Sequence, residues 1–218
     1  MEENIKKREV GMKGDIKNII FDLGGVIMDL DVGKTIEGFR CLGITNIINE
    51  TGHHYTNRVF YDLEIGKISK TEFLSELTKM SDQDILPSAI GKAWNAMILG
   101  MPKERIDFLM RLKNKYRIFL LSNTNCIHQR KFLSQFKKQY GFHFNELFEK
   151  AYYSHEIGMR KPDIKTFQFV ISDSGIVPIK TLFVDDSLEN INHAKETGLQ
   201  VFHVKNYDWL NLVENNTH

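Results

Sequence analysis

The chain has 218 residues, 42% of them hydrophobic, so it is long enough to fold around one sizeable core with a small insertion. Its 29 Lys and Arg residues balance 28 Asp and Glu residues, and a net charge of +1 provides no general attraction to nucleic acid or to an anionic membrane. We therefore expect neither as a partner. The two cysteines, Cys41 and Cys126, lie far apart without metal-site spacing, which is typical of a protein of the reducing cytoplasm.

Residues 1–14, MEENIKKREVGMKG, are charged and lack an apolar stretch, so we interpret them as a frayed tail and neither as a signal peptide nor as a membrane anchor. Short runs of apolar, β-branched and aromatic residues follow at NIIFDL, YRIFLLS, AYYS, TLFVDD and LQVFHV. Amphipathic helical segments separate the later runs. This alternation predicts an α/β fold, with a doubly wound parallel sheet and helical crossovers.

Two crossover helices are predicted over residues 101–115, where Pro102 opens the helix, and over residues 187–197, where Gly198 ends it. Their apolar faces are predicted to comprise Ile106, Leu109 and Met110 in the first helix and Leu188, Ile191 and Ala194 in the second. Both helices should pack on the sheet.

The interval from Val32 to Leu99 departs from the alternation, because it contains helical patterns but no convincing strand. We interpret residues 32–99 as an inserted helical cap and residues 15–31 and 100–212 as the α/β core; the alternative is one continuous mixed domain. Because the interval leaves the core just after Asp22, the cap is predicted to lie over that edge of the sheet and to close over a ligand. Its aromatic residues are more often core than substrate contacts, and Trp94 is the first candidate to face the site.

Three predicted strands end in polar residues: Asp22 after IIF, Ser122 and Asn123 after FLL, and Asp185 and Asp186 after LFV. The carboxyl ends of parallel strands share one edge, where ligands bind. Between the last two strand ends lies GMRKPD, which places Lys161 before a proline. Taken singly, most of these residues are ordinary helix caps.

Taken together, three acids at one edge would repel one another unless a lysine or a divalent cation neutralised them, and hard oxygen ligands favour Mg²⁺. In such a site Asp22 would attack phosphorus and form an aspartyl phosphate. Mg²⁺ and Lys161 would offset charge on the transferred group, and Ser122 and Asn123 would donate hydrogen bonds to its oxygens. Water would then hydrolyse the intermediate.

The stretches FDLGGVI, LLSNTN, GMRKPD and LFVDDSLENI resemble, in order, the four motifs of the haloacid dehalogenase superfamily of hydrolases, and the resemblance extends from about residue 17 to residue 205. It implies that Asp22 is the nucleophile and that Ser122 and Asn123 bind phosphate. It also implies that Lys161 pairs with the phosphate and with the nucleophile Asp22. Within the superfamily, the motifs and the short insertion look most like the α-D-glucose-1-phosphatase branch.

The same resemblance implies a Mg²⁺ site formed by Asp22, the backbone carbonyl of Gly24, and Asp186, with Asp185 beside it as a direct or indirect ligand. Most phosphatases of the superfamily carry a second aspartate, a general acid, at the position of Gly24. Asp29 or Asp31 could replace it, although both more often begin a linker. Alternatively, an anomeric sugar phosphate has a better leaving group than an ordinary alkoxide and needs less proton donation.

We therefore predict a Mg²⁺-dependent phosphatase of small phosphorylated metabolites, with sugar phosphates favoured. One alternative is a 2-haloacid dehalogenase-like hydrolase, in which the aspartate attacks carbon; the Asp185–Asp186 pair opposes it, because that chemistry needs no metal. The other alternative is a catalytically weak regulatory or binding protein, which the retained charges of Asp22 and Lys161 oppose.

Overall fold

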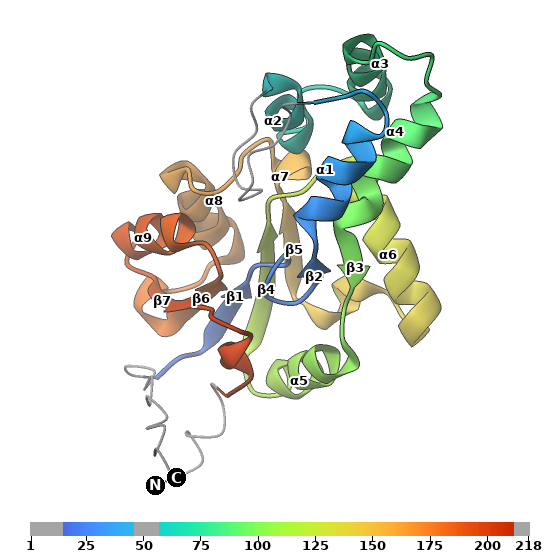
Figure 1. Ribbon diagram of the computed structural model, residues 1–218. Coiled ribbons are helices and arrows are strands. Elements are labelled where there is room, and N and C mark those ends of the chain that lie inside the picture. Colours follow the sequence, from blue (N-terminus) through green and yellow to red (C-terminus); the bar gives the residue numbers. More distant parts are fainter. Residues whose placement is uncertain (1–14, 46–56, 212–218) are drawn as a thin grey trace, which may run out of the picture.

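The computed structural model describes residues 15–45 and 57–211, so the predicted tail at residues 1–14 lies outside the described residues. Five parallel strands form one sheet in the order β5–β4–β1–β6–β7 (Figure 1). Their bounds are Lys150–Tyr153 (β5), Arg117–Ser122 (β4), Asn18–Phe21 (β1), Thr181–Asp185 (β6) and Gln200–His203 (β7). All five strands match the predicted apolar runs, and the predicted α/β fold with a parallel sheet is confirmed.

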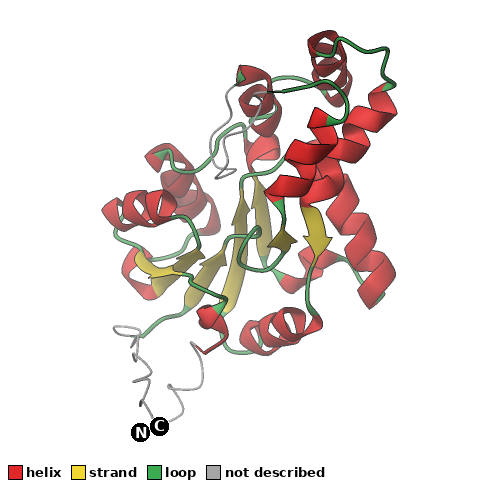
Figure 2. Cartoon of the chain, in the orientation of Figure 1, coloured by secondary structure: helices red, strands yellow, loops and turns green. Residues whose placement is uncertain are grey.

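Helices cover both faces of the sheet (Figure 2). Side chains alternate between the faces along each strand, so Ile20 and Phe183 pack with α8 (Ile164–Ser174) and α9 (Leu188–Glu196). Ile19 and Phe21 belong instead to the larger apolar cluster, which includes α5 (Lys103–Lys113) and α6 (Cys126–Tyr140). The core also contains the short helix α7 (Ser154–Ile157). Where the structure describes the chain, 3₁₀ turns occupy Asn95–Met97, Phe144–Leu147, Pro178–Lys180 and Asp208–Asn211.

The predicted apolar faces of α5 and α9 are correct in part. Ile106, Leu109, Ile191 and Ala194 are buried, whereas Met110 is 48% exposed and Leu188 is 57% exposed. In α5 the buried stripe runs through Phe108 and Leu112 instead, because residues three and four apart share a helix face while Met110 is turned about 100° from Leu109. Leu188 is the first residue of α9 and lies at its exposed end.

Among the described residues of the insertion, four helices stand over the carboxyl edge of the sheet (Figure 1): α1 (Val32–Arg40), α2 (Arg58–Glu64), α3 (Lys70–Met80) and α4 (Pro87–Trp94). A short antiparallel ribbon of β2 (Asp29–Leu30) and β3 (Ile98–Gly100) connects them with the core. The expectation of no strand between Val32 and Leu99 is therefore wrong at its last two residues. A strand of three residues is too short to show a periodic pattern.

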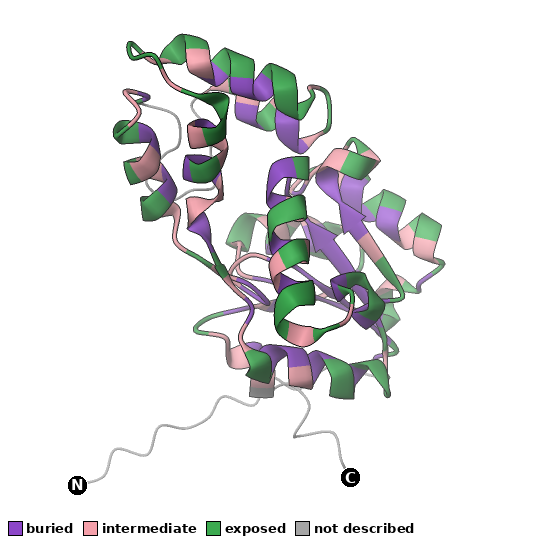
Figure 3. Ribbon diagram, turned by 90° about the vertical axis from the view of Figure 1, so that its right-hand side faces the viewer, coloured by how far each residue is buried: buried purple, intermediate pink, exposed green. Residues whose placement is uncertain are grey.

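The inserted helices share an aromatic core. In Figure 3 the buried residues of these helices are coloured purple. Trp94 lies at its centre, with its ring centroid 5.1 Å from that of Phe60 and 5.9 Å from those of Phe39 and Phe73. Trp94 is fully buried, so it belongs to the core, as expected for most of these aromatic residues, and is not the residue that faces the site. Within the part of the chain that the structure describes, no helix is long and apolar enough to cross a membrane.

Candidate active site

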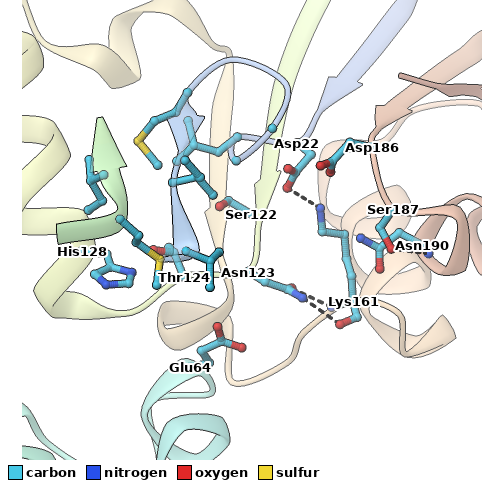
Figure 4. Close-up of a pocket in the computed structure, with 18 of the residues that line it drawn as sticks. Asp22, Glu64, Ser122, Asn123, Thr124, His128, Lys161, Asp186, Ser187 and Asn190 are labelled. Carbon is cyan, nitrogen blue, oxygen red and sulfur yellow. Dashed lines mark hydrogen bonds and ion pairs between the residues drawn. The ribbon is translucent and has the colours of Figure 1, made fainter. Parts of the chain in front are cut away.

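The polar residues at the strand ends converge as predicted. Asp22 follows β1, and Asp185 is the last residue of β6, the neighbouring strand. Lys161, from the loop before α8, lies between their carboxylates. Its Nζ donates to Asp22 Oδ1 at 2.5 Å (Figure 4) and to Asp185 Oδ2 at 2.6 Å. Lys161 is 1% exposed. The ammonium group therefore bridges two carboxylates at the edge of the sheet.

Asn123, just beyond β4, fixes the backbone of Lys161. Its side-chain Oδ1 accepts from the Lys161 N–H at 2.9 Å, and its Nδ2 donates to the Lys161 carbonyl at 2.8 Å (Figure 4). The lysine is thus held at both ends, by an amide at its backbone and by carboxylates at its ammonium group. Because the Asn123 side chain is used in this way, its backbone N–H is the group left to contact a phosphate. Asp163 caps α8 by accepting from the Lys165 N–H.

The two neighbouring aspartates have different surroundings. Asp185 is fully buried and accepts hydrogen bonds from Lys161, from the Ser187 N–H at 2.8 Å and from Asn190 Nδ2 at 3.0 Å. Asp186 lines the cavity in front of the strand ends, and Ser187 caps α9. Asp185 therefore orients Lys161, and Asp186 is the carboxylate that faces the cavity.

The carboxylates outnumber the lysine. The site is largely desolvated and has a formal charge of −2, because three carboxylates (Asp22, Asp185 and Asp186) face one ammonium group, that of Lys161. Burial raises the pKa of Asp22, Lys161 opposes this, and the other two aspartates add to the rise. For Lys161, burial would lower the pKa, but Asp185 and Asp22 outweigh it and raise the pKa, so the amine stays charged.

The residues present fit a magnesium ion. Asp22, Gly24 and Asp186 line the same cavity and offer carboxylate and carbonyl oxygens. Gly25 has φ +72°, and a Cβ there would lie 2.1 Å from Asp186 Oδ2, so only glycine leaves room for that carboxylate. Among residues 15–45 and 57–211, no group of three or more His, Cys, Asp or Glu side chains is placed to hold a metal ion by itself. Two carboxylates and a carbonyl leave the remaining positions of an octahedral ion for water and substrate.

The cavity in front of these groups has a volume of about 310 Å³, at the lower end of the range for small-molecule sites. One wall is apolar and is formed by Met28, Leu30, Val32, Met97 and Ile98. Ser122 and Asn123 line the same cavity as Asp22, as predicted. Glu64 from α2 and Arg160 from the GMRKPD loop also line it, and sequence analysis missed both. The only signal for Arg160 was its place beside Lys161; Glu64 gave none.

Neither candidate for the missing general acid lines the cavity. Asp29 pairs with Arg105 Nη1 at 2.8 Å and accepts from the Tyr207 hydroxyl at 2.7 Å, and Asp31 caps α1. Both act as parts of the linker, the more ordinary of the two roles expected for them. A Cβ at Gly24 would lie 2.6 Å from Leu30 Cδ1, so an apolar side chain fills the space where the usual acid would begin.

His128 joins the core to the inserted helices at the side of the cavity. Its Nε2 lies 2.9 Å from the Trp94 carbonyl, which can only accept, so this nitrogen carries the proton. Its Nδ1 then accepts from the Asn125 side-chain amide at 3.2 Å. Burial lowers the pKa of His128 to about 4, although the bond to Trp94 opposes the shift. The ring is therefore neutral at pH 7.

Comparison with known proteins identifies the family. The model of the haloacid dehalogenase-like hydrolases matches residues 19–204. The chain belongs to this family. A D-ribitol-5-phosphate phosphatase of Bacteroides thetaiotaomicron is 34% identical over 195 residues, which cover 89% of this chain and 95% of that protein.

Solved structures of the same family are similar to this chain in sequence and fold. A haloacid dehalogenase family enzyme of the same bacterium, in a magnesium complex, is 35% identical with a TM-score of 0.85, covering 92% of this chain and all of that one. A haloacid dehalogenase-like hydrolase of Porphyromonas gingivalis is 31% identical with a TM-score of 0.81, covering 91% of this chain and 96% of that one. The prediction of a phosphatase of this superfamily is confirmed by the family match and the ribitol-phosphate phosphatase. The prediction of magnesium as cofactor is confirmed by the magnesium complex of the similar enzyme.

Proposed function

We propose that the chain hydrolyses the phosphate monoester of a small sugar alcohol, with a five-carbon polyol 5-phosphate as the first substrate to test. The observation that carries the reaction is the Asp22–Lys161–Asp185 bridge at the strand ends. The substrate class is supported by the ribitol-phosphate phosphatase, which is similar to this chain over 89% of its length. A cytoplasmic location belongs to the proposal, because both cysteines are free and exposed.

In this reaction Asp22 attacks phosphorus, the bond to the alcohol oxygen breaks, and the aspartyl phosphate is hydrolysed by water. Lys161 holds Asp22 in place and offsets charge on the transferred group, while Ser122 and the backbone N–H of Asn123 donate to its oxygens. Asp185 acts through Lys161 and is a positioning residue.

A magnesium ion bound by Asp22, the Gly24 carbonyl and Asp186 would offset negative charge on the phosphate oxygens. The inserted helices, residues 32–99 as predicted from the sequence, act as the cap over this site, and residues 15–31 and 100–212 form the core. The cap separates the reacting phosphate from bulk water.

A second candidate substrate is an anomeric sugar phosphate, as expected for the α-D-glucose-1-phosphatase branch. Gly24 and Leu30 favour this substrate. Gly24 stands where most phosphatases of the superfamily carry the general acid, and the Leu30 side chain occupies the space that such an acid would need. An anomeric oxygen leaves as part of a hemiacetal and needs less proton donation than a primary alkoxide.

The test is phosphate release from ribitol 5-phosphate, glucose 1-phosphate, glucose 6-phosphate, nucleotides and a haloacid control, with Mg²⁺ or with EDTA. We expect Mg²⁺-dependent turnover that is lost in Asp22→Asn. Asp31→Asn is the matched control, since asparagine caps a helix as well as aspartate does, and it should retain activity. Absence of turnover from the folded protein would favour a regulatory role, and release of halide would favour a dehalogenase.

A further inference from the structure

We propose that Glu64 and Arg160 together bind the hydroxyl groups of the substrate and select a polyhydroxylated carbon chain. The inference rests on the proposed phosphatase function and names the residues that choose its substrate. It concerns two charged side chains that line the cavity and belong neither to the carboxylate–lysine bridge nor to the predicted magnesium ligands.

The pair occupies the part of the cavity away from the reacting groups. In Figure 4, Glu64 lies on the opposite side from Asp22 and Asp186, with Asn123 and Lys161 between them, and its carboxylate is directed into the cavity. A substrate whose phosphate contacts Asp22 therefore extends its carbon chain toward Glu64.

The chemistry of the pair suits hydroxyl groups. Arg160 Nε lies 3.0 Å from Glu64 Oε2, and the side chains are only 20% and 7% exposed. A hydroxyl group both donates and accepts, so a guanidinium and a carboxylate side by side can satisfy two neighbouring hydroxyls at once. The pair has no net charge, so it does not compete with the catalytic site for the phosphate dianion.

A purely structural role explains the pair less well. Taking two charges out of water costs free energy that a buried ion pair often fails to recover compared with apolar residues. The inserted helices are also held to the core without it. Gly66, with φ +67°, packs so tightly on α7 that a Cβ there would lie 2.2 Å from the His155 carbonyl, and His128 binds the Trp94 carbonyl. The end of α2 is thus fixed by backbone packing, which also fixes the position of Glu64.

The test compares ribitol 5-phosphate with 5-hydroxypentyl phosphate, which has the same length and the same primary leaving group but lacks the three internal hydroxyls. We expect the wild type to prefer ribitol 5-phosphate by at least about 100-fold in kcat/KM, since a site built to bind hydroxyls rejects an analogue without them. Glu64→Gln and Arg160→Met should each reduce this preference by at least about tenfold, mainly through KM for ribitol 5-phosphate. Glu37→Gln is the matched control, because Glu37 forms an exposed ion pair with Arg40 on the inserted helix α1.

The outcomes separate the two proposals. If Glu64→Gln lowered kcat/KM equally for both substrates, the pair would have a purely structural role. That result would overturn the inference but would leave the proposed phosphatase function standing. A wild type that turns over both substrates equally would overturn it without any variant, even if the variants failed to fold. Turnover of neither substrate would instead refute the proposed function. Calorimetry provides a readout that does not depend on turnover. The affinity of the Asp22→Asn variant for ribitol 5-phosphate should fall by at least about tenfold when Glu64→Gln is added.

Discussion

The buried His128 should make the stability of the protein depend on pH in a defined window. Its pKa is about 4 in the folded state against 6.5 for a free imidazole, chiefly because of burial. Between these two values the unfolded chain binds a proton that the folded chain does not, so the free energy of unfolding falls as the pH falls. Above pH 6.5 both states are neutral at this group, and its contribution is complete.

The size of the effect follows from the shift. A pKa lowered from 6.5 to about 4 corresponds to a total of about 3 kcal/mol, at 1.36 kcal/mol for each pH unit. About 2 kcal/mol of this should be lost between pH 7 and pH 4.5. The proton would enter a ring that already donates from Nε2 to Trp94 and accepts at Nδ1 from Asn125, so protonation also turns the second contact into donor against donor.

Urea denaturation of the wild type and of His128→Gln near pH 7 and pH 4.5 measures this contribution. Glutamine can still donate to the Trp94 carbonyl but does not titrate, and the other titrating groups are common to both proteins. We expect the wild type to lose about 2 kcal/mol more than the variant over this interval. Equal losses in the two proteins, or an NMR titration of the His128 ring near pH 6.5, would refute the reasoning.

Three variants test the reaction centre. Gly25→Ala should reduce turnover by at least about 100-fold and weaken Mg²⁺ binding measured by calorimetry, because its Cβ would collide with Asp186. Lys161→Met should abolish turnover and lower the free energy of unfolding by about 3–5 kcal/mol in urea denaturation, since it leaves two buried carboxylates unpaired. Gly24→Asp combined with Leu30→Ala should raise kcat for primary-alcohol phosphates more than for anomeric phosphates; an unchanged ratio would contradict the leaving-group argument.

The sequence predicted the sheet and the convergence of the polar strand-end residues for the same reason. Each central strand is a short apolar run that needs no distant information to be recognised, and parallel strands must bring their carboxyl ends to one edge. Asp22, Ser122 and Asp185 therefore had to meet. No local pattern distinguishes Asp185 from Asp186, although the family resemblance had already indicated Asp186 as a metal ligand. Their different surroundings depend on which hydrogen bonds the folded chain completes: Asp185 is enclosed by Ser187 and Asn190, whereas Asp186 is left facing the cavity.

The remainder of the cavity depends on how the inserted helices dock, and no local pattern records this. Trp94 was the most conspicuous side chain of the insertion, yet its size made it the centre of the aromatic core. Glu64 looked like any helical glutamate, and it enters the cavity only because Gly66 allows α2 to approach α7. Leu30 closes the space beside Gly24 from a two-residue strand that is too short to recognise.

The charges of the cavity explain how one group of residues can carry out the reaction while a different pair selects the substrate. The inner group of three carboxylates and one lysine has a formal charge of −2, which repels a phosphate dianion, and a divalent cation brings it to zero. The outer pair of Glu64 and Arg160 is already neutral and needs no cation. Because the inner group is set by strand ends and the outer pair by an inserted helix and a loop, substitutions in the pair can alter the choice of substrate without moving Asp22 or Asp186.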